Sequence, residues 1–392
     1  MPTAIRDVEL DDTRPLTGLD GYERCMCVFR WRGTVVGRGH VPVRNGRVDT
    51  RAIDARASRA LGRDALRVWL EDTLGFDGRS RLTVAERPAV TVAICTRDRP
   101  DDLRRTLAGV SRLSPAADEV LVVDNAPSTD RTRAVVSRCA GVRYVVESRP
   151  GLDRARNRAM LEAAGAVVAF TDDDAIPDPE WLDALVRNFA DPRVLAVSGL
   201  TLPLELETPA QERFEEHCGF VRGFRRRVYD GRVDHPLQVS GIGAGANLAV
   251  RRGLTTLVGA FDELLDAGTP AMSGGDHDMF TRILAAGYRI VYEPRAVSRH
   301  RHRRTDDELH RVVRGYGTGV GAMWFGRLVG HHDLGVLRLA WRWFRHDHLP
   351  LLRRPMRLFR PDARDALRRA ELAGLLGGPL AWLRGRLGGS RV

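Results

Sequence analysis

Short apolar runs alternate with helix-like segments from residue 90 onward, and this alternation limits the fold more than any other feature of the sequence. The run at 90–94 is rich in β-branched residues, which is typical of a strand buried on both faces of a parallel sheet. Strands that alternate with helices of about 10–15 residues predict βαβ units around such a sheet. We expect further strands at 120–123, 142–146, 167–170, 194–197 and 289–292, and helices at 103–110, 134–138, 152–164, 179–189 and 274–286.

The segments on either side of this alternation have a different character. Strand-like pieces at 25–31 and 34–43 lead to the turn dipeptide Asn45-Gly46 and to a helical stretch, and 79–88 reads as a linker. The C-terminal part contains amphipathic, arginine-rich helices. We therefore predict an α/β fold with a mostly parallel sheet and flanking helices, in three parts: an N-terminal α+β segment with its linker at 1–88, a catalytic domain at 89–304 and a C-terminal helical region at 305–392.

The composition is that of a globular protein. Apolar residues make up 43% and charged residues 29% of the chain, which argues against extended disorder. The formal charge of +11 would suggest a polyanion partner, but every basic residue is an arginine, and this bias weakens an argument from charge. Because aromatic residues are not interleaved with the basic patches, we expect no nucleic-acid partner.

Cysteines and apolar runs bear on the cellular compartment. The five cysteines include no C-x-x-C pair, so the sequence predicts neither a zinc knuckle nor a disulfide framework. The N-terminus lacks the apolar core of a secretory signal, and no run reaches the roughly 18 apolar residues of a spanning helix. We expect a cytoplasmic protein.

Three consecutive carboxylates, Asp172, Asp173 and Asp174, follow the strand predicted at 167–170. Their mutual repulsion is costly unless a cation neutralises it, and oxygen ligands suit Mn²⁺ or Mg²⁺. The alternative is an acidic turn that caps the next helix, but we expect Asp178 to cap that helix. Ligands of parallel sheets gather at the carboxyl ends of strands, so this position favours a metal site.

A second acidic residue, Asp276, follows two glycines at the start of the helix predicted at 274–286. A carboxylate at that place is suited to act as the general base for a hydroxyl group. The alternative is a plain helix N-cap, a role that aspartate often fills.

Five segments, in order, resemble the motifs of family 2 glycosyltransferases with the GT-A fold, a Rossmann-like α/β architecture. They are 90–97 (VTVAICTR), 122–130 (VVDNAPSTD), 151–157 (GLDRARN), 171–174 (TDDD) and 275–278 (GDHD). Each motif is weak alone, but the ordered set is specific, and the resemblance covers about 89–302. It implies a nucleotide-diphosphate-sugar donor, a hydroxyl-bearing acceptor and Mn²⁺ or Mg²⁺ as cofactor.

The resemblance also implies a role for each matching residue. Asp276 is the catalytic base, and Asp172 and Asp174 form the DXD pair that addresses ribose and metal. Contacts with the nucleotide-sugar are implied for Thr96, Arg97, Asp124, Arg156, Asp172 and Asp173. Acceptor-side positions are Gly243, Ala244, Asn247 and Asp278, and the metal ligands are Asp174 and His300.

Several of these roles have an alternative. Asp124 could instead form an Asx-turn with Ser128 or Thr129, and Arg156 could lie on a charged helix face. His302 competes with His300 for the metal, and the arginines that surround both histidines oppose a nearby cation.

One departure from the family concerns Gly275, because the family often has glutamate there. The chain also lacks the Gln-x-x-Arg-Trp motif and the membrane spans of processive synthases, which favours the addition of a single sugar. The implied reaction is a direct displacement with inversion, assisted by metal and by the base.

Two other functions remain alternatives. A sugar nucleotidylyltransferase would need a glycine-rich loop after the first strand, and 95–99 has no glycine. A non-catalytic protein that binds nucleic acid or another polyanion rests on charge alone. The C-terminal helices could either pack on the catalytic domain or contact an anionic membrane, at the inner membrane face and near a lipid-linked acceptor.

Overall fold

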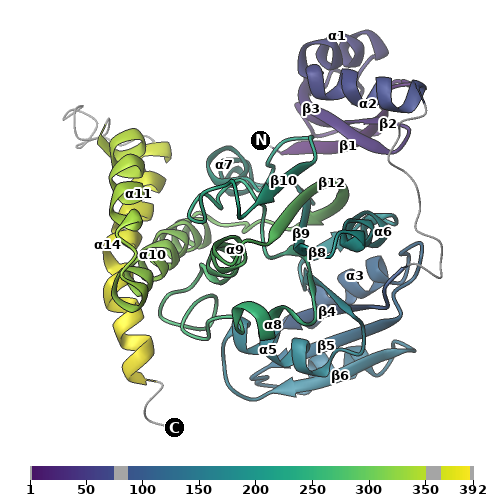
Figure 1. The fold of residues 1–392 in the computed structure, drawn as a ribbon. Helices are drawn as coiled ribbons and strands as arrows, with labels where there is room; N and C mark the ends of the chain where they lie inside the picture. The colour runs from purple at the N-terminus through teal and green to yellow at the C-terminus, as the bar shows by residue number, and fades with distance from the viewer. Residues whose placement is uncertain (1, 75–86, 350–362, 389–392) are drawn as a thin grey trace.

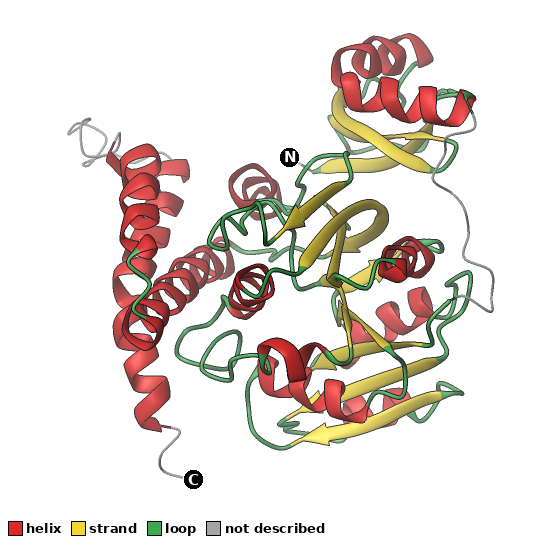
Figure 2. Cartoon of the chain, viewed as in Figure 1, coloured by secondary structure: helices red, strands yellow, loops and turns green. Residues whose placement is uncertain are grey.

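The computed structural model describes residues 2–74, 87–349 and 363–388, so most of the linker expected at 79–88 lies outside the described residues. A central sheet with helices on both faces forms the body of the molecule (Figures 1 and 2). A small three-stranded sheet lies at one end of it, and a layer of long helices lies at its side. The predicted α/β architecture with a parallel-rich sheet is confirmed.

The central sheet has nine strands in the order β10-β12-β9-β11-β7-β4-β5-β6, with β8 paired to β12. Neighbours β7, β4, β5 and β6 run parallel, whereas β11 runs antiparallel to both β7 and β9. The strands are β4 (Val90–Thr96), β5 (Glu119–Asn125), β6 (Val142–Glu147), β7 (Val167–Asp172), β8 (Ala175–Pro177), β9 (Val194–Pro203), β10 (Arg227–Asp230), β11 (Asn247–Arg251) and β12 (Arg289–His300).

Each face of this sheet has its own hydrophobic core. Along β4, Val92 and Ile94 point to one face, whereas Ala93 and Cys95 point to the other. The first face is covered by α3 (Pro100–Val110), α4 (Arg131–Val136) and α6 (Trp181–Val186), and the second by α5 (Leu152–Glu162), α8 (Leu254–Val258) and α9 (Gly275–Ala285). Burial on both faces explains why the strands are continuous apolar runs.

The helix expected at 179–189 differs from the prediction. Its α-helical part, α6, begins at Trp181, with Glu180 as N-cap, and a 3-10 turn (Arg187–Ala190) follows it. Asp178 is therefore not the N-terminal cap. Its carboxylate instead pairs with Arg30, at 2.5 Å from Nη2, and with Arg299. A half-buried arginine from the N-terminal part pairs with this carboxylate, and a local helix signal cannot reveal such a partner.

The N-terminal part forms a separate small sheet. β1 (Thr3–Glu9) runs parallel to β2 (Arg24–Trp31), which forms a hairpin with β3 (Thr34–Pro42). α1 (Thr50–Ala60) and α2 (Arg63–Thr73) pack on it, and the two thiols Cys25 and Cys27 share its core. The predicted turn at Asn45-Gly46 is confirmed, because Arg44 and Arg47 pair across it. The sequence prediction missed β1.

α7 (Pro209–Cys218) lies between β9 and β10, and α10 (Asp306–His331) follows β12. Then α11 (Gly335–Trp343), a π-helical turn (Phe344–His348) and α14 (Ala363–Gly388) complete the described chain. Glycines let α10 and α14 touch backbone to backbone, and a Cβ on Gly378 would collide with Gly321. The C-terminal helices thus pack on the rest of the molecule with one face, as one of the two alternatives anticipated. No described helix is long and apolar enough to cross a membrane.

Candidate active site

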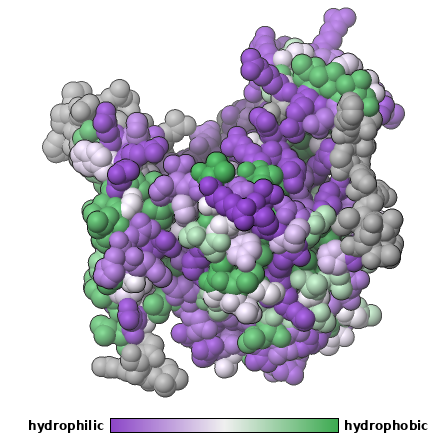
Figure 3. Space-filling model, viewed as in Figure 1, coloured by the Kyte–Doolittle hydropathy of each residue, from purple (hydrophilic) through white to green (hydrophobic). Residues whose placement is uncertain are grey.

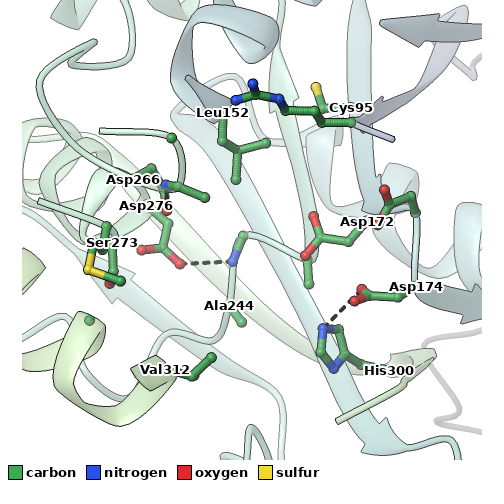
Figure 4. A pocket seen from close by; sticks show the side chains of 18 of the residues that line it. Cys95, Leu152, Asp172, Asp174, Ala244, Asp266, Ser273, Asp276, His300 and Val312 are labelled. Atoms are coloured by element: carbon green, nitrogen blue, oxygen red, sulfur yellow. Dashed lines mark hydrogen bonds and ion pairs between the residues drawn. The ribbon is translucent and has the colours of Figure 1, made fainter. Parts of the chain in front are cut away.

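A cavity of about 500 Å³ opens at the carboxyl ends of the central strands. Its walls come from the end of β4, the turn between β7 and β8, the end of β12, the loop before β11, the start of α9 and the first half of α10. Figure 4 shows Asp172, Asp174 and His300 on one side of this cavity and Asp276 on the other. The sheet topology brings these residues together, because parallel strands end at one edge.

One wall carries a set of potential metal ligands, Asp172, Asp174 and His300. One ligand atom from each of them lies within 4.8 Å of the others. Asp172 ends β7, Asp174 follows it on the same side, and β12 brings in His300 by pairing with β8, with His300 opposite Ala175. Two carboxylates and one imidazole are a donor set that suits Mn²⁺ or Mg²⁺, so the residues present fit the expected cofactor.

The charges around this set favour the ionised form of one carboxylate. Burial alone would raise the pKa of Asp174, but the charges of His300 and Arg303 hold it below its usual value. Burial and repulsion from Asp174 raise the pKa of Asp172. Two carboxylates this close to each other need a positive charge between them, which a divalent cation supplies.

A chain of hydrogen bonds fixes the orientation of His300. Its Nδ1 lies 3.4 Å from Nδ1 of His302, whose Nε2 lies 2.9 Å from a carboxylate oxygen of Glu215. Since a carboxylate only accepts, His302 donates from Nε2, and its Nδ1 is left to accept from His300. The remaining nitrogen of His300, Nε2, lies 3.1 Å from Asp174. Its lone pair becomes available to a metal when the ring is neutral.

The two histidines lie in different surroundings. The cluster contains His300, whereas His302 is buried against Glu215, which in turn pairs with Arg38 of β3. Burial opposes the charged form of His300, yet the carboxylate of Asp174 raises the pKa of His300 above its usual value.

Three of the four arginines near the histidines pair with carboxylates away from the cluster, in contrast to the expectation that they oppose a cation. Arg299 pairs with Asp7, Arg301 with Asp102 and Arg304 with Glu205, all outside the cluster. Only Arg303, of these four, reaches Asp174, at 3.5 Å.

Asp173, the middle carboxylate, points elsewhere. Its Oδ2 accepts a hydrogen bond from the Thr96 hydroxyl at 2.7 Å, and its Oδ1 pairs with Arg99 at 3.3 Å. Burial and repulsion from Asp174 raise its pKa to about 7. Asp173 and Thr96 thus tie the β7–β8 turn to the end of β4, although both also border the cavity.

Asp276 stands on the opposite wall, in the first turn of α9. Gly274 is the N-cap, so the plain-cap alternative is wrong for Asp276. Its carboxylate accepts hydrogen bonds from the backbone N–H groups of Gly245, at 2.9 Å, and His277, at 2.8 Å. Burial favours the neutral acid, but these donors and the charges of His277 and Arg156 lower the pKa of Asp276. An ionised carboxylate held beside the cavity is able to accept a proton.

A buried ionic cluster lies behind Asp276. Nη1 of Arg156 lies 2.8 Å from Asp153 and 2.6 Å from Asp266. Arg156 is buried, so the alternative of an arginine on a charged helix face is wrong. Oδ2 of Asp153 has no hydrogen-bond partner among the described residues, and burial together with repulsion from Asp266 raises the pKa of Asp153 well above its usual value.

Comparisons with known proteins agree with this geometry. Residues 91–252 match the model of the family described as Glycosyl transferase family 2. The chain contains a family 2 glycosyltransferase domain. Its fold is of the GT-A type. A solved structure, the mannosyltransferase PcManGT from Pyrobaculum calidifontis in complex with GDP-Man and Mn²⁺, aligns with a TM-score of 0.51 and 22% identity, over 74% of this chain and 87% of that one. This likeness shows the fold.

Two curated glycosyltransferases are similar in sequence to this chain. The Pre-mycofactocin glycosyltransferase of Mycobacterium tuberculosis is 31% identical over 218 residues, which are 55% of this chain and 43% of that protein. The Glycosyltransferase AglE of Haloferax volcanii is 26% identical over 248 residues, which are 60% of this chain and 74% of that protein. The chain thus spans less than half the length of the first relative.

Four residues that the family 2 resemblance singled out do not line the cavity: Asp124, Gly243, Asn247 and Asp278. Asn247 is fully buried and bonds to Trp181 and to two backbone carbonyls, so it braces the sheet. Asp278 pairs with Arg282 on its own helix.

Asp124 lies next to the cavity residue Asn125, at the end of β5. It accepts a hydrogen bond from the Tyr144 hydroxyl at 2.7 Å, and its other oxygen has no partner among the described residues. The alternative of an Asx-turn with Ser128 is wrong for the described residues, because Ser128 donates to Asp98 instead.

Sequence reasoning missed several cavity residues of this family 2 domain. Asp266 belongs to a loop without a motif, and Arg311 and Tyr316 belong to α10, beyond the catalytic boundary drawn at 304. The amphipathic pattern of 305–392 indicated a helix but could not indicate which turns face the cavity. The exposed Arg97 and the backbone of Ala244 do border it, as expected.

Proposed function

We propose that this protein transfers one sugar from a nucleotide-diphosphate-sugar to a hydroxyl group, with a divalent cation and with inversion at the anomeric carbon. The observation that carries the proposal is that the cluster of Asp172, Asp174 and His300 faces Asp276 across one cavity (Figure 4). A leaving diphosphate and an attacking hydroxyl need stabilisation on opposite sides of the sugar, and these walls offer it.

The chemistry divides between the two walls. Asp172, Asp174 and His300 would hold the cation, which would supply Lewis-acid stabilisation to the departing diphosphate. Asp276 accepts the proton of the acceptor hydroxyl as that oxygen bonds to the anomeric carbon. The bond from this carbon to the diphosphate oxygen breaks, and its electron pair leaves with the diphosphate. The N–H groups of Gly245 and His277 hold the carboxylate in place for this step.

The remaining roles extend the proposal to the donor and the acceptor. Thr96 and Arg97 border the nucleotide. Arg156 pairs with Asp153 and Asp266 and places a positive charge in the cavity wall next to the nucleotide. Asp124 is fully buried and adjoins the nucleotide side only through its neighbour Asn125, which lines the cavity. Ala244 shapes the acceptor side. Catalysis belongs to 89–304 together with the first half of α10, and a cytoplasmic location is part of the proposal.

Mn²⁺ and GDP-mannose are the first cofactor and donor to test, because the Pyrobaculum structure contains both. Thermal unfolding is measured with a panel of nucleotide diphosphates and their sugars, with Mn²⁺, Mg²⁺ or EDTA. A ligand at 100 times its Kd stabilises by about 2.7 kcal/mol, which such an assay detects. We expect a shift that needs metal and that Asp174→Asn abolishes. A panel without any metal-dependent shift contradicts the proposal.

The stereochemistry of the product tests the inversion separately. The anomeric configuration of a transferred sugar is read by NMR on the product of the donor that the thermal assay identifies. An α-linked donor must give a β-linked product if Asp276 deprotonates the acceptor in a single displacement. An α-linked product excludes this mechanism and leaves the donor site intact.

A further inference from the structure

A stripe of exposed leucines follows one face of α14. Leu376, Leu380, Leu383 and Leu387 are spaced by four, three and four residues, which places them on the same side of the helix. The first and last of them are 72% and 71% exposed. We call these four residues the leucine face. Figure 3 shows apolar side chains along the side of the molecule where α11 and α14 lie.

The leucine face is what remains after α14 has packed. The other side of the helix carries Gly378 and Trp382, which contact Gly321 and Phe325 of α10. α14 already packs on α10 through one face, so its packing does not require that the opposite face also be apolar. Large exposed apolar patches on a folded protein mark binding surfaces.

α11 adds apolar side chains of the same kind. Leu337 and Trp341 are four residues apart and exposed, whereas Val336 is buried against the neighbouring helices. α11 thus repeats the arrangement of α14, with one packed side and one exposed apolar side.

The charges on α11 and on the C-terminal part of α14 are of one sign. Between residues 372 and 388 there is no aspartate or glutamate, and the charged residues are Arg384 and Arg386, both exposed. α11 likewise contains no carboxylate, and its Arg338 and Arg342 are exposed. Apolar side chains flanked by arginines fit the interface of an anionic bilayer, where leucines enter the acyl boundary and arginines reach phosphates.

We propose that the leucine face, together with the exposed side of α11, docks this protein on an anionic lipid surface. The helices lie on the surface and do not cross it, since no described helix has the length and hydropathy to span a bilayer. A second copy of the chain is a poorer occupant, because two such faces would bring arginines of like charge together.

Docking would set the orientation of the cavity toward the membrane. α10 connects the two regions, because its Arg311 and Tyr316 line the cavity and its Phe325 packs on α14. A hydroxyl acceptor carried by the membrane would then reach the cavity along a fixed direction. The docking surface itself does not depend on the proposed function.

Co-sedimentation of the full chain with lipid vesicles tests the proposal. Vesicles of phosphatidylcholine alone are compared with vesicles that also contain phosphatidylglycerol, at low and at high salt. The double variant Leu380→Gln/Leu387→Gln removes half of the leucine face. The matched control is Leu161→Gln, because Leu161 is 84% exposed on α5, far along the chain from these helices.

We expect the wild type and Leu161→Gln to bind anionic vesicles alike, and the double variant to bind at least tenfold more weakly. Arg384→Gln should weaken binding to anionic vesicles about fivefold and reduce its salt dependence, since one arginine near such a surface contributes about 1 kcal/mol. Wild-type protein that stays in the supernatant at low salt overturns the proposal, as does a double variant that binds like the wild type.

Two further measurements distinguish lipid docking from dimerisation and from the proposed transferase function. Size-exclusion chromatography with light scattering shows whether the double variant loses a dimer; a dimer lost without any vesicle binding assigns the face to a second copy and overturns lipid docking. The metal-dependent thermal shift by a nucleotide-sugar should be the same in the wild type and the double variant. Failure of the proposed transferase therefore shows in that assay alone, and failure of docking shows only with vesicles.

Discussion

The Cβ atom that Gly275 lacks would lie 2.7 Å from Cγ of Asp153 and closer still to its Oδ2. The buried carboxyl group of Asp153 thus occupies the space where a side chain at position 275 would begin. Family 2 glycosyltransferases often have glutamate at this position, next to the base. In this chain the second acidic group beside Asp276 comes from α5 instead of α9, and Gly275 and Asp153 depend on each other.

Replacing Gly275 by alanine should therefore destabilise the protein, although alanine has the higher helix propensity. Alanine in a helix is normally more stable than glycine by about 1 kcal/mol. Here the added methyl group displaces a buried carboxyl group, and overpacking of this kind costs about 1–3 kcal/mol. We expect Gly275→Ala to lower the free energy of unfolding, measured by urea denaturation, and to lower kcat because Asp276 is the next residue.

Gly330→Ala is the matched control, because Gly330 lies in α10 with nothing within 4 Å of the place that the added methyl group would take. It should be neutral or slightly stabilising. The double variant Asp153→Ala/Gly275→Ala should be less destabilised than the sum of the single changes, because removal of the carboxyl group makes room for the methyl group. Additive losses would show that the two residues do not compete for this space.

The proposed base is tested by Asp276→Asn. Asparagine keeps the size of the side chain and its bond from Gly245 but cannot take a proton, so we expect kcat to fall by about 10²–10⁴. The metal-dependent thermal shift by the donor should persist. Asp183→Asn, on α6 and paired with Arg187, is the control and should keep normal turnover. A variant at position 276 with near-normal kcat would remove Asp276 from this role.

The central fold was predictable because its signal is local. The buried strands β4, β5, β7 and β9 each contain a continuous apolar run, and such runs are visible without knowledge of their neighbours. The cap at Asp178 was wrong because Arg30, almost 150 residues away in the chain, pairs with that carboxylate. β1 was missed because its burial depends on the parallel pairing with β2. Its sequence, TAIRDVE, has only two consecutive apolar residues, which is too short a run to predict a strand.

The site was predictable where a motif marks the end of a strand or the start of a helix. Asp172, Asp174, His300 and Asp276 follow this rule, and the sheet brings them to one cavity. Asp153 and Asp266 were missed because their roles depend on burial around Arg156. Asn247 was misassigned because a polar residue after a glycine-rich loop looks like a ligand, whereas the structure uses it to bond Trp181.

Glu215 should control metal affinity without touching the metal. It holds His302, and His302 in turn directs the protonated nitrogen of His300 away from the cluster. Loss of such an outer partner typically weakens a metal site by 10–100-fold. We expect Glu215→Leu to weaken Mn²⁺ binding by about that factor in isothermal titration calorimetry, whereas Glu215→Gln, which still accepts from His302, should stay within a few-fold of the wild type.

The same calorimetry separates positioning from simple loss of fold. If Glu215→Leu keeps its circular dichroism spectrum and Mn²⁺ affinity is unchanged, His300 is held by other contacts and the hydrogen-bond chain has no role. Equal weakening by leucine and glutamine would show that the charge of Glu215 matters, and not the direction of the bond.

Because the pKa of Asp153 is raised in the folded protein, the free energy of unfolding should decrease as pH rises. In the unfolded chain its carboxyl group loses its proton near the ordinary pKa of about 3.9, whereas in the folded protein burial and the neighbouring Asp266 keep the proton bound to higher pH. Above pH 4 the folded state therefore binds more protons than the unfolded state, and its stability falls as pH rises, by at most about 1.4 kcal/mol per pH unit.

Asp153→Asn removes this proton and keeps the oxygen that accepts from Arg156. The free energy of unfolding of the wild type minus that of the variant, measured by urea denaturation from pH 5 to pH 8, should fall as pH rises. Asp230→Asn is the control, because arginines lower the pKa of Asp230, and its difference should be flat over this range. A wild type that gains stability over Asp153→Asn with rising pH would mean that Arg156 keeps Asp153 ionised, and the carboxyl group beside Gly275 would then be a charged partner of Arg156 instead of a buried acid.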